Sequence, residues 1–365
     1  MVAVRRRSVR FASLSDVEEA GRRAVSPKLW SYVAGGAGVE WTERANELAF
    51  DRWALRPRVL SGVREVDLGT HLLDEPVRAP FYVAPTAYQG LVHPDGEVGV
   101  ARAAARAGLL AMFSTLSSDS LESIAGARPR GPRWFQLYLQ PDWAKTARLV
   151  RRAERASFGA IVLTADVPVL GVRDRQLRTG FAIDSSIPLG SGPGVIPPSR
   201  GPEPAGGRFS TGRREAEAWE VVDRLREVTR LPVIVKGVLG AEDARLAVRH
   251  GARAVVVSNH GGRQLDRSPP SLAMLPEVVA AVRGRAEVYL DGGVRRGSDV
   301  LVALALGARA VGVGRPVLWA LAAGGAAGVD RYLDLLAADT ASAMILTGRS
   351  SVRAVSRTLV APWTP

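Results

Sequence analysis

Short apolar runs rich in Val, Ile and Leu alternate with longer amphipathic stretches from residue 80 onward. This alternation is typical of repeated strand–helix units around a parallel sheet. Eight runs fit strands, at 80–84, 109–113, 134–139, 160–165, 232–236, 254–258, 287–291 and 310–314. The amphipathic stretches predict helices at 97–107, 143–156, 215–228, 241–249, 272–282 and 298–306. Eight such units in about 250 residues favour an α/β fold of the TIM (β/α)8 barrel type.

An internal repeat supports the barrel. HGARAVVVSNHGG at 250–262 and LGARAVGVGRP at 306–316 are two copies of one helix-end, strand and loop unit. The alternative is an open dinucleotide-binding sheet, which predicts a G-x-G-x-x-G turn after the first strand. The segment 85–90 reads PTAYQG instead. The closed barrel is therefore the better prediction.

The chain is expected to form one domain, 1–365. Residues 1–79 hold one predicted helix, at 14–24, and form a cap outside the barrel, which occupies 80–350. Residues 185–212 hold seven Gly and six Pro among 28 residues. A loop of this length is functional or disordered, and its position after the fourth strand places it on the active-site side of a barrel. Residues 351–365 form a C-terminal tail.

Composition excludes several classes of function. The 365 residues include no cysteine, so disulfides, Fe–S clusters and thiolate metal sites are excluded, and no metal site is expected. Basic residues outnumber acidic ones 49 to 36, a net charge of +13 that raises the alternative of a nucleic-acid-binding module. All but three of these cations are arginines, however, and acids are interspersed among them, which is typical of solvated helix faces. We expect no nucleic-acid partner.

Membrane and secretion signals are also not expected. Four arginines in residues 1–10 precede no apolar segment of the kind that a secretory signal needs. The longest uncharged apolar-rich run, 316–329, is too short to cross a bilayer. We therefore expect a cytoplasmic protein without a membrane partner.

The predicted strands end in residues that can carry chemistry. His260, one of four histidines, directly follows the strand AVVVSN and precedes two glycines that allow a ligand to approach the backbone. A lone histidine is more often structural, but its position beside Arg263 favours a catalytic base. Asp166 ends the fourth strand and is the candidate carboxylate to orient that imidazole; its alternative role is a helix cap.

Cations at other strand ends indicate an anionic ligand. Arg173 and Arg263 could grip one small carboxylate, although either alone is more often a surface arginine. Lys236 closes the strand PVIVKG in a chain that otherwise uses arginine, which favours a cofactor contact. DGGVRRG at 291–297 and VGRP at 313–316 follow the seventh and eighth strands, the usual phosphate site of this fold.

Together these residues resemble the FMN-dependent 2-hydroxy acid oxidases and dehydrogenases, a family that includes glycolate oxidase, lactate oxidase and mandelate dehydrogenase. The most specific motif is SNHGGRQLD at 258–266. Supporting matches cover nearly the whole chain: APTA at 84–87, WFQLY at 134–138, LTADVP at 163–168, VKG at 235–237, DGGVRRG and VGRP.

The resemblance implies FMN across the barrel mouth and assigns roles by position. His260 matches the general base, Asp166 its partner, and Tyr138 a residue that bonds the substrate beside them. The implied substrate-binding residues are Tyr32, Tyr138, Arg173, His260 and Arg263. The implied cofactor-binding residues are Pro85, Thr86, Ala87, Ser114, Gln136, Thr164, Lys236, Ser258, Asp291, Gly292, Gly293, Arg295, Gly314 and Arg315.

The resemblance also implies a reaction: an (S)-2-hydroxy acid is oxidised to the 2-oxo acid, with O2 as acceptor and H2O2 as product. PTAYQGLVHPDGE and STLSSDSLESIAG look most similar to the actinobacterial 4-hydroxymandelate oxidase branch. Leu116 stands where glycolate oxidases have tryptophan, which leaves room for an aryl group, and Ala87 against the flavin favours an oxidase. The alternatives are a glycolate- or lactate-type enzyme and a flavin barrel of the isomerase type. Members of the family are commonly homotetramers.

Overall fold

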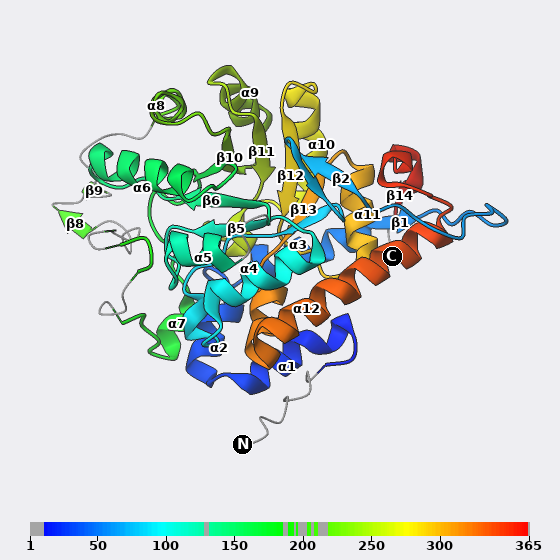
Figure 1. Cartoon of the computed structure of the whole chain (residues 1–365), viewed down its shortest axis with the longest axis horizontal. Helices are drawn as coiled ribbons and strands as arrows, with labels where there is room; N and C mark the ends of the chain where they lie inside the picture. Colours follow the sequence, from blue (N-terminus) through cyan, green and yellow to red (C-terminus); the bar gives the residue numbers. More distant parts are fainter. Residues whose placement is uncertain are drawn as a thin grey trace.

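The computed structural model describes residues 11–127, 131–184, 189–192, 195, 203–205, 208–210 and 218–363. Eight parallel strands close into a barrel in the order β4-β5-β6-β7-β10-β11-β12-β13, which is also their order along the chain (Figure 1). The predicted TIM barrel is therefore confirmed. The strands are β4 Phe81–Val83, β5 Ala111–Ser114, β6 Arg133–Leu137, β7 Ile161–Thr164, β10 Val233–Val238, β11 Ala254–Val257, β12 Glu287–Asp291 and β13 Ala310–Val313.

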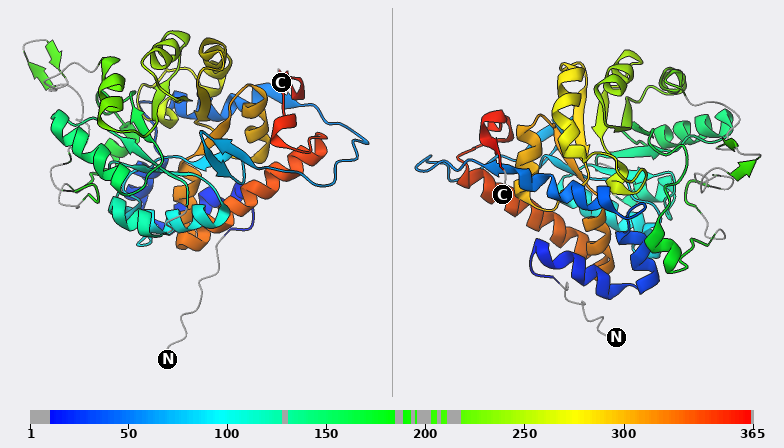
Figure 2. Two further views of the ribbon diagram at one scale, coloured as in Figure 1. Left: turned by 45° about the horizontal axis from the view of Figure 1, so that its top comes forward. Right: turned by 180° about the vertical axis from the view of Figure 1, so that it is seen from behind.

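Helices between the strands cover the outside of the barrel, as two further views show (Figure 2). Five of the six predicted helices match within a residue or so at each end. The sixth, expected at 215–228, begins at Glu220, while 215–217 lie outside the described residues. The helices after the strands are α4 Gly96–Ala107, α5 Leu121–Ala127, α6 Trp143–Arg155, α7 Asp174–Arg178, α8 Glu220–Val228, α9 Ala241–Arg249, α10 Ser271–Val282, α11 Gly297–Ala305 and α12 Arg315–Leu346.

Alternation along each strand builds two cores. In β4, Phe81 and Val83 face the helices, whereas Tyr82 faces the barrel interior. Inside the barrel, Tyr289 contacts Tyr82 and Trp134 at ring-centroid distances of 5.9 and 5.6 Å. All these side chains are buried. Because large rings fill the interior, the barrel is a packed core, and ligands are confined to its mouth.

The cap and the tail are joined. The single helix expected at 14–24 is a 3-10 turn, Leu14–Asp16, followed by α1 Val17–Ala24. The cap continues with α2 Pro27–Ala34 and α3 Trp41–Leu48, and α1 packs along the long α12 (Figure 1). Strand β1 Trp53–Leu55 pairs antiparallel with β14 Val360–Pro362 near the C-terminus. A hairpin of β2 Thr70–Leu72 and β3 Glu75–Val77 precedes the barrel.

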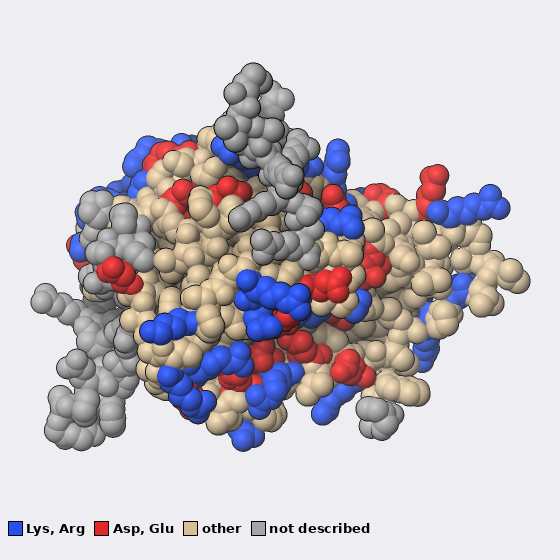
Figure 3. All heavy atoms as spheres, turned by 90° about the horizontal axis from the view of Figure 1, so that it is seen from below, with Lys and Arg blue, Asp and Glu red and all other residues tan. Residues whose placement is uncertain are grey.

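The segment expected as a structureless loop, 185–212, contains two short strands, β8 Glu203–Ala205 and β9 Arg208–Ser210, which pair antiparallel. Much of this segment lies outside the described residues. The molecular face drawn in Figure 3 mixes basic and acidic side chains, as expected for solvated helix faces. Within the part of the chain that the structure describes, no helix is both long and apolar enough to cross a membrane.

Candidate active site

A cavity of about 750 Å³ lies at the carboxyl ends of the barrel strands. The carboxyl ends of the eight strands, or the loops that follow them, line it, and the cap contributes Tyr32 and Val33 from α2. Parallel strands bring their carboxyl ends to one face of a barrel, so residues far apart in the sequence meet there. The cavity is therefore the place where the candidate residues can act together.

His260 and Asp166 form a pair at the edge of this cavity. The Nδ1 atom of His260 lies 3.1 Å from Oδ1 of Asp166. Burial opposes ionisation of Asp166, but the nearby His260 and Lys236 outweigh it and lower the pKa of the carboxyl. The second oxygen of Asp166, Oδ2, is buried without a hydrogen-bond partner. An ionised Asp166 would hold the imidazole with Nδ1 protonated, leaving Nε2 free to take a proton.

Gln264 explains why the two loops that carry this pair meet. Its amide nitrogen donates to the backbone oxygens of Asp166 and Val169, at 3.0 and 2.7 Å. Its amide oxygen accepts from the backbone N–H of Gly171 at 3.1 Å. A Cβ on Gly171 would lie 2.4 Å from the backbone oxygen of Gln264, so only glycine allows this approach. Gln264 lies in the motif SNHGGRQLD, but the sequence did not single it out.

Lys236 lies in a buried charged chain below the cavity. Its Nζ donates to Oγ of Ser258 at 2.8 Å and lies 3.1 Å from a carboxylate oxygen of Asp291. The Ser258 hydroxyl donates in turn to Asp291 at 2.6 Å and accepts from the backbone N–H of His260 at 3.1 Å. Strands β10, β11 and β12 are neighbours in the sheet, and this adjacency places the three side chains in a row.

Gln136 links the next three strands of the barrel. Its side-chain oxygen accepts from the Ser114 hydroxyl at 2.9 Å, and its nitrogen donates to Oγ1 of Thr164 at 2.8 Å. All three side chains are buried. The chain Ser114–Gln136–Thr164 thus fixes polar groups at the ends of β5, β6 and β7 under the cavity floor.

Two arginines supply unbalanced positive charge to the cavity. Arg263 donates to the backbone oxygens of Tyr32 and Gly35, at 2.9 and 2.5 Å, and lies over the Tyr32 ring. Burial, together with the like charge of Arg173, lowers the pKa of Arg263 to about 9. The Nε atom of Arg173 is buried and has no hydrogen-bond partner among the described residues. Among the described residues neither arginine forms an ion pair, so the arrangement favours an anionic ligand.

Two tyrosines complete this side of the cavity. Tyr138 lines it from the end of β6, and burial, with a contribution from Asp166, raises the pKa of its hydroxyl. Tyr32 stacks on Phe181 at a ring-centroid distance of 5.4 Å. The Tyr138 phenol therefore stays neutral at physiological pH and can donate a hydrogen bond to a ligand.

The other end of the cavity has the features of a phosphate site. Gly292 and Gly293 have φ of 102° and 88°, and a Cβ on Gly314 would meet no atom closer than 3.8 Å, so backbone there is open to a ligand. Arg295 and Arg315 line the same end. Within the described part of the chain, the Nε atom of Arg295 is buried without a hydrogen-bond partner. An unsatisfied buried donor beside glycine-rich backbone fits the phosphate of a flavin mononucleotide.

The cap is bonded to these loops through residues that the sequence did not reveal. Asn46 of α3 and Asn259 exchange side-chain amide hydrogen bonds of 2.9 and 2.8 Å. The Asn259 oxygen also accepts from the backbone N–H of Gly262. A Cβ on Gly293 would lie 2.2 Å from the backbone oxygen of Asn46. A buried asparagine in a short helix belongs to no sequence pattern that would have identified it.

Apolar side chains form the wall of the cavity that borders the loops after β5 and β7. They are Leu116, Leu170, Val172, Leu177, Phe181, Ile183, Leu189 and Val195. This wall is formed by more large apolar groups than a two- or three-carbon acid needs to contact. The arrangement can therefore bind a ligand that is anionic at one end and apolar at the other.

Most of the predicted site residues line this one cavity. They are Tyr32, Pro85, Thr86, Ala87, Ser114, Tyr138, Arg173, Lys236, His260, Arg263, Asp291, Gly292, Gly293, Arg295, Gly314 and Arg315. Asp166, Gln136, Thr164 and Ser258 lie behind the lining and contact it through the hydrogen bonds described above. Within the described residues no group of three His, Asp or Glu side chains is placed to hold a metal ion.

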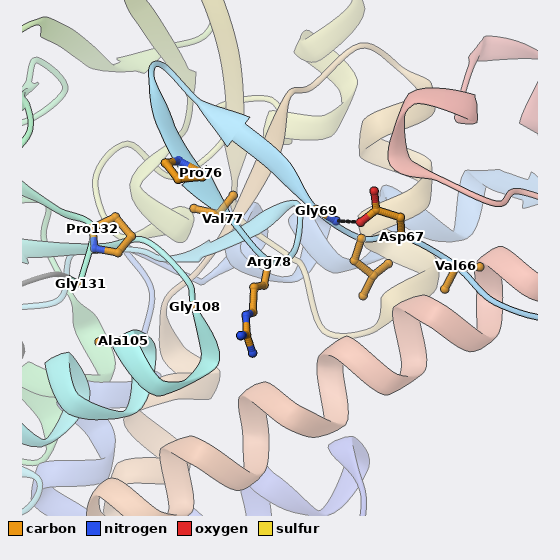
Figure 4. A pocket seen from close by; sticks show the side chains of 11 residues that line it. Val66, Asp67, Gly69, Pro76, Val77, Arg78, Ala105, Gly108, Gly131 and Pro132 are labelled. Carbon is orange, nitrogen blue, oxygen red and sulfur yellow. Dashed lines mark hydrogen bonds between the residues drawn. The ribbon is translucent and has the colours of Figure 1, made fainter.

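A second hollow, of about 1000 Å³, lies at the opposite end of the barrel (Figure 4). Residues before the barrel strands line it, including Arg78, Gly108 and Pro132, together with the strand β3. Its only charged lining groups are Asp67 and the exposed Arg78. Its lining contains no histidine, lysine or tyrosine and none of the predicted site residues, so it is not the active-site candidate.

Comparison with known proteins identifies the class that this fold and site define. The family model of the FMN-dependent dehydrogenases matches residues 21–362, and the chain belongs to that family. The chain is 47% identical to 4-hydroxymandelate oxidase from Amycolatopsis orientalis over 351 residues, 95% of this chain and 97% of that protein. It is 42% identical to 2-hydroxyacid oxidase 2 from Rattus norvegicus over 347 residues, with the same coverage.

Solved structures give the same result. A crystal structure of a mandelate oxidase variant with 2-hydroxy-phenylacetamide matches 97% of this chain and 100% of that chain, with a TM-score of 0.88 and 44% identity. A mandelate oxidase mutant with (S)-mandelic acid matches with a TM-score of 0.87 at 44% identity over 97% of this chain and 100% of the other. The chain is accordingly an FMN-dependent oxidoreductase of the 2-hydroxy acid oxidase family.

Proposed function

We propose that this chain oxidises aromatic (S)-2-hydroxy acids of the mandelate or 4-hydroxymandelate type to their 2-oxo acids, with O2 as acceptor and H2O2 as product. One observation carries the proposal. The His260–Asp166 pair, the unpaired arginines Arg173 and Arg263 and an apolar wall all line or border one cavity. These groups match the three parts of such a substrate: the hydroxyl, the carboxylate and the aryl group.

His260 acts as the general base. Its Nδ1 faces the ionised carboxylate of Asp166, which stabilises the imidazolium that forms when Nε2 accepts a proton. The proton comes from the hydroxyl or the adjacent carbon of the substrate. The Tyr138 hydroxyl, kept neutral by burial, donates a hydrogen bond to the substrate oxygen beside the base.

Arg173 and Arg263 bind the substrate carboxylate. Removing two guanidiniums from water without a counterion is costly, and a bound carboxylate offsets that cost through charge-assisted hydrogen bonds. The Tyr32 hydroxyl bonds the same carboxylate, because Arg263 lies over the Tyr32 ring. The clamp fixes which substrate carbon faces the flavin.

Residues below and beside the substrate hold FMN, which when bound accepts two electrons from the substrate carbon and delivers them to oxygen. Lys236 would supply a fixed positive charge that favours reduction of the flavin. Pro85, Thr86 and Ala87 would contact the ring system, and Ser114, Gln136, Thr164 and Ser258 would supply polar contacts. Asp291, Gly292, Gly293, Arg295, Gly314 and Arg315 would hold the ribityl chain and phosphate.

The apolar wall and the relatives support an aromatic substrate. Leu116 is buried and lines the cavity where a tryptophan would fill it. The relatives named above include 4-hydroxymandelate oxidase and structures titled mandelate oxidase. A chain 42% identical is named L-lactate oxidase, so lactate is the competing substrate.

Anaerobic flavin reduction tests the proposal. Mixing the yellow holoenzyme with (S)-mandelate, (S)-4-hydroxymandelate, (S)-lactate or glycolate should bleach the flavin, with the largest kcat/KM for the two aromatic acids. Readmission of air should restore the colour and release H2O2 in equal amount to the 2-oxo acid. A larger kcat/KM for lactate would assign the chain to the lactate type, and no bleaching by any 2-hydroxy acid would overturn the reaction itself.

The chain is further proposed to act as a cytoplasmic homotetramer. Val59 and Leu60 are 83% and 102% exposed on a loop between β1 and β2, a position that suits burial against another copy. Light scattering checks this directly, because one chain has a mass of 38.9 kDa. Replacing both residues by serine should shift the assembly toward smaller species, and an unchanged mass would place the interface elsewhere.

A further inference from the structure

Helix α3 presents two glutamates to the two arginines at the phosphate end of the cavity. Oε1 of Glu43 accepts from Nη1 of Arg315 at 2.6 Å, and Oε1 of Glu47 accepts from Nη2 of Arg295 at 2.5 Å. Positions 43 and 47 are one helical turn apart, so both carboxylates lie on the same face of α3. The ion pairs therefore join the cap to the loops after β12 and β13.

Arg315 and Glu43 are tightly packed at the phosphate end of the cavity. Arg315 is 9% exposed and also donates to the backbone oxygens of Ala34 and Gly261, at 3.2 and 2.9 Å. A Cβ on Gly262 would lie 2.5 Å from the backbone nitrogen of Glu43, so α3 packs tightly on the loop after β11. Glu43 is consequently held beside Arg315 by the fold.

The two glutamates balance the positive charges of Arg295 and Arg315. Burial and the like charge of Arg295 lower the pKa of Arg315, whereas Glu43 and Glu47 oppose this effect. Burial raises the pKa of Glu18 in α1, and the positive charges of the same two arginines oppose this rise. In the protein without a phosphate, Glu43 and Glu47 are the counterions that keep two neighbouring guanidiniums charged in a partly buried place.

An anionic phosphate would supply the same charge from the other side. Arg295 already has one donor, Nε, that is buried and unbonded and lies on the edge of the guanidinium that also carries Nη2. Once a dianionic phosphate neutralises the arginines, the two glutamates are no longer required as counterions. They instead repel the phosphate across a short distance of low dielectric.

We propose that Glu43 and Glu47 are internal anions that occupy the phosphate arginines in the apoprotein, stabilising the empty site and weakening FMN binding. The proposal rests on the assignment of Arg295 and Arg315 to the FMN phosphate. The proposal predicts a change in FMN affinity opposite to the change expected if the glutamates only positioned the arginines. Removing either negative charge should destabilise the apoprotein and strengthen FMN binding. A residue that merely positioned the arginines would weaken FMN when lost.

The experiment measures FMN binding to the apoprotein by quenching of flavin fluorescence, in wild type, Glu43→Gln and Glu47→Gln. Glutamine keeps the size and a hydrogen-bond acceptor while removing the charge. We expect each variant to bind FMN about two- to fivefold more tightly, because partly exposed charge pairs have coupling energies of that order. The apoproteins should melt below wild type, and inorganic phosphate should raise their Tm more than it raises that of wild type.

Controls separate the possible causes. Glu19→Gln removes an exposed glutamate of α1 that pairs with Arg22 and Arg23, and should change neither FMN affinity nor the effect of phosphate. Riboflavin, which lacks the phosphate, should bind all variants equally. Equal gains for riboflavin and FMN, or weaker FMN binding in both variants, would overturn the proposal.

A different result would show that the assignment of Arg295 and Arg315 to the FMN phosphate is wrong. If Arg295→Gln leaves the affinities for FMN and riboflavin equal to those of wild type, these arginines do not bind the phosphate. If Glu43→Gln does not fold, Glu47→Gln remains a full test, since Glu47 is 43% exposed and its replacement disturbs packing little. Unchanged FMN affinity in a folded Glu47→Gln protein contradicts the proposal.

Discussion

At the scale of single residues, the site depends on backbone conformations that side chains outside the cavity enforce. His260 has φ of 59°, the left-handed region that a non-glycine residue seldom adopts. Asn259 holds this turn by accepting from Gly262, and Ser258 accepts from the N–H of His260 itself. The strained backbone conformation of His260 is maintained by these hydrogen bonds. The imidazole is therefore oriented before a substrate enters.

His260→Gln should bind FMN normally and slow anaerobic flavin reduction about 10²- to 10⁴-fold, because a positioned base contributes that range. Stopped-flow bleaching by (S)-mandelate is the measurement. His250→Gln is a matched control, since His250 also pairs with an aspartate, Asp223, but on the outside of the barrel. A reduction rate in His260→Gln equal to that of the control would exclude His260 as the base.

Leu116→Trp should convert the specificity from aromatic toward small acids. The larger ring occupies the part of the cavity that we assign to the aryl group, so kcat/KM for mandelate should fall at least about tenfold relative to that for lactate, a cost of the size expected for loss of apolar binding space. Parallel steady-state assays on both acids give the ratio. An unchanged ratio would place the aryl group elsewhere, for example along Phe181.

At the scale of elements, helix α4 ties together two loops of the cavity. Glu97 is buried in its first turn and accepts from the backbone N–H groups of Gln89, Ser118 and Asp119. The loops after β4 and β5, which present Ala87 and Leu116, are thereby fixed to one side chain. Burial raises the pKa of Glu97, and the backbone donors offset the rise only in part.

Glu97→Gln should lower the free energy of unfolding at neutral pH by about 1–3 kcal/mol, since an amide cannot accept all three N–H groups and leaves a buried donor unpaired. Urea unfolding measures this, and Glu122→Gln, an exposed glutamate bonded to Arg152, is the control. A stability equal to that of wild type would show that water satisfies these donors.

The same residue gives a pH dependence. Because the pKa of Glu97 is raised in the native state, the folded protein keeps this proton at a pH where the unfolded chain, with an ordinary value of 4.5, has released it. The contribution of Glu97 to stability therefore decreases as pH rises from 4.5 through the raised value. This slope should be absent in Glu97→Gln, and an identical pH profile in both proteins would contradict it.

Elements with a strong local pattern were predictable, and contacts between them were not. The barrel strands follow from short apolar runs, and His260, Lys236 and the arginines follow from their positions at strand ends. Helices α2 and α3 were missed because they are short and flanked by glycine. Glu43 and Arg315 are 272 positions apart, and no periodicity along a chain encodes such a pairing.

At the scale of the whole molecule, the cap and the barrel together line one cavity. Helix α3 touches the loops after β11, β12 and β13, while α1 packs on α12 and β1 pairs with β14. A ligand bound between these parts stabilises all of them together, because it binds the folded chain and not the unfolded one. Loss of the cofactor should therefore lower the stability of the whole fold.

Removal of FMN should lower the Tm, and FMN restored at 100 times its Kd should add about 2.7 kcal/mol to the free energy of unfolding. Differential scanning calorimetry of the apo and reconstituted proteins measures both. Riboflavin at the same concentration should restore less, because it lacks the phosphate that we assign to Arg295 and Arg315 and so binds the folded chain more weakly. Equal recovery with riboflavin would show that the phosphate does not contribute to the stability gained on binding.

The site is built from residues spread along most of the chain, and this determines at which stage of folding FMN can bind. The cavity is lined from Tyr32 to Leu318, and β1 finds its partner only at Val360–Pro362. The cavity is therefore complete only after segments far apart along the chain have been synthesised and have packed together. FMN needs this assembled cavity to bind, so it cannot assist the first steps of folding.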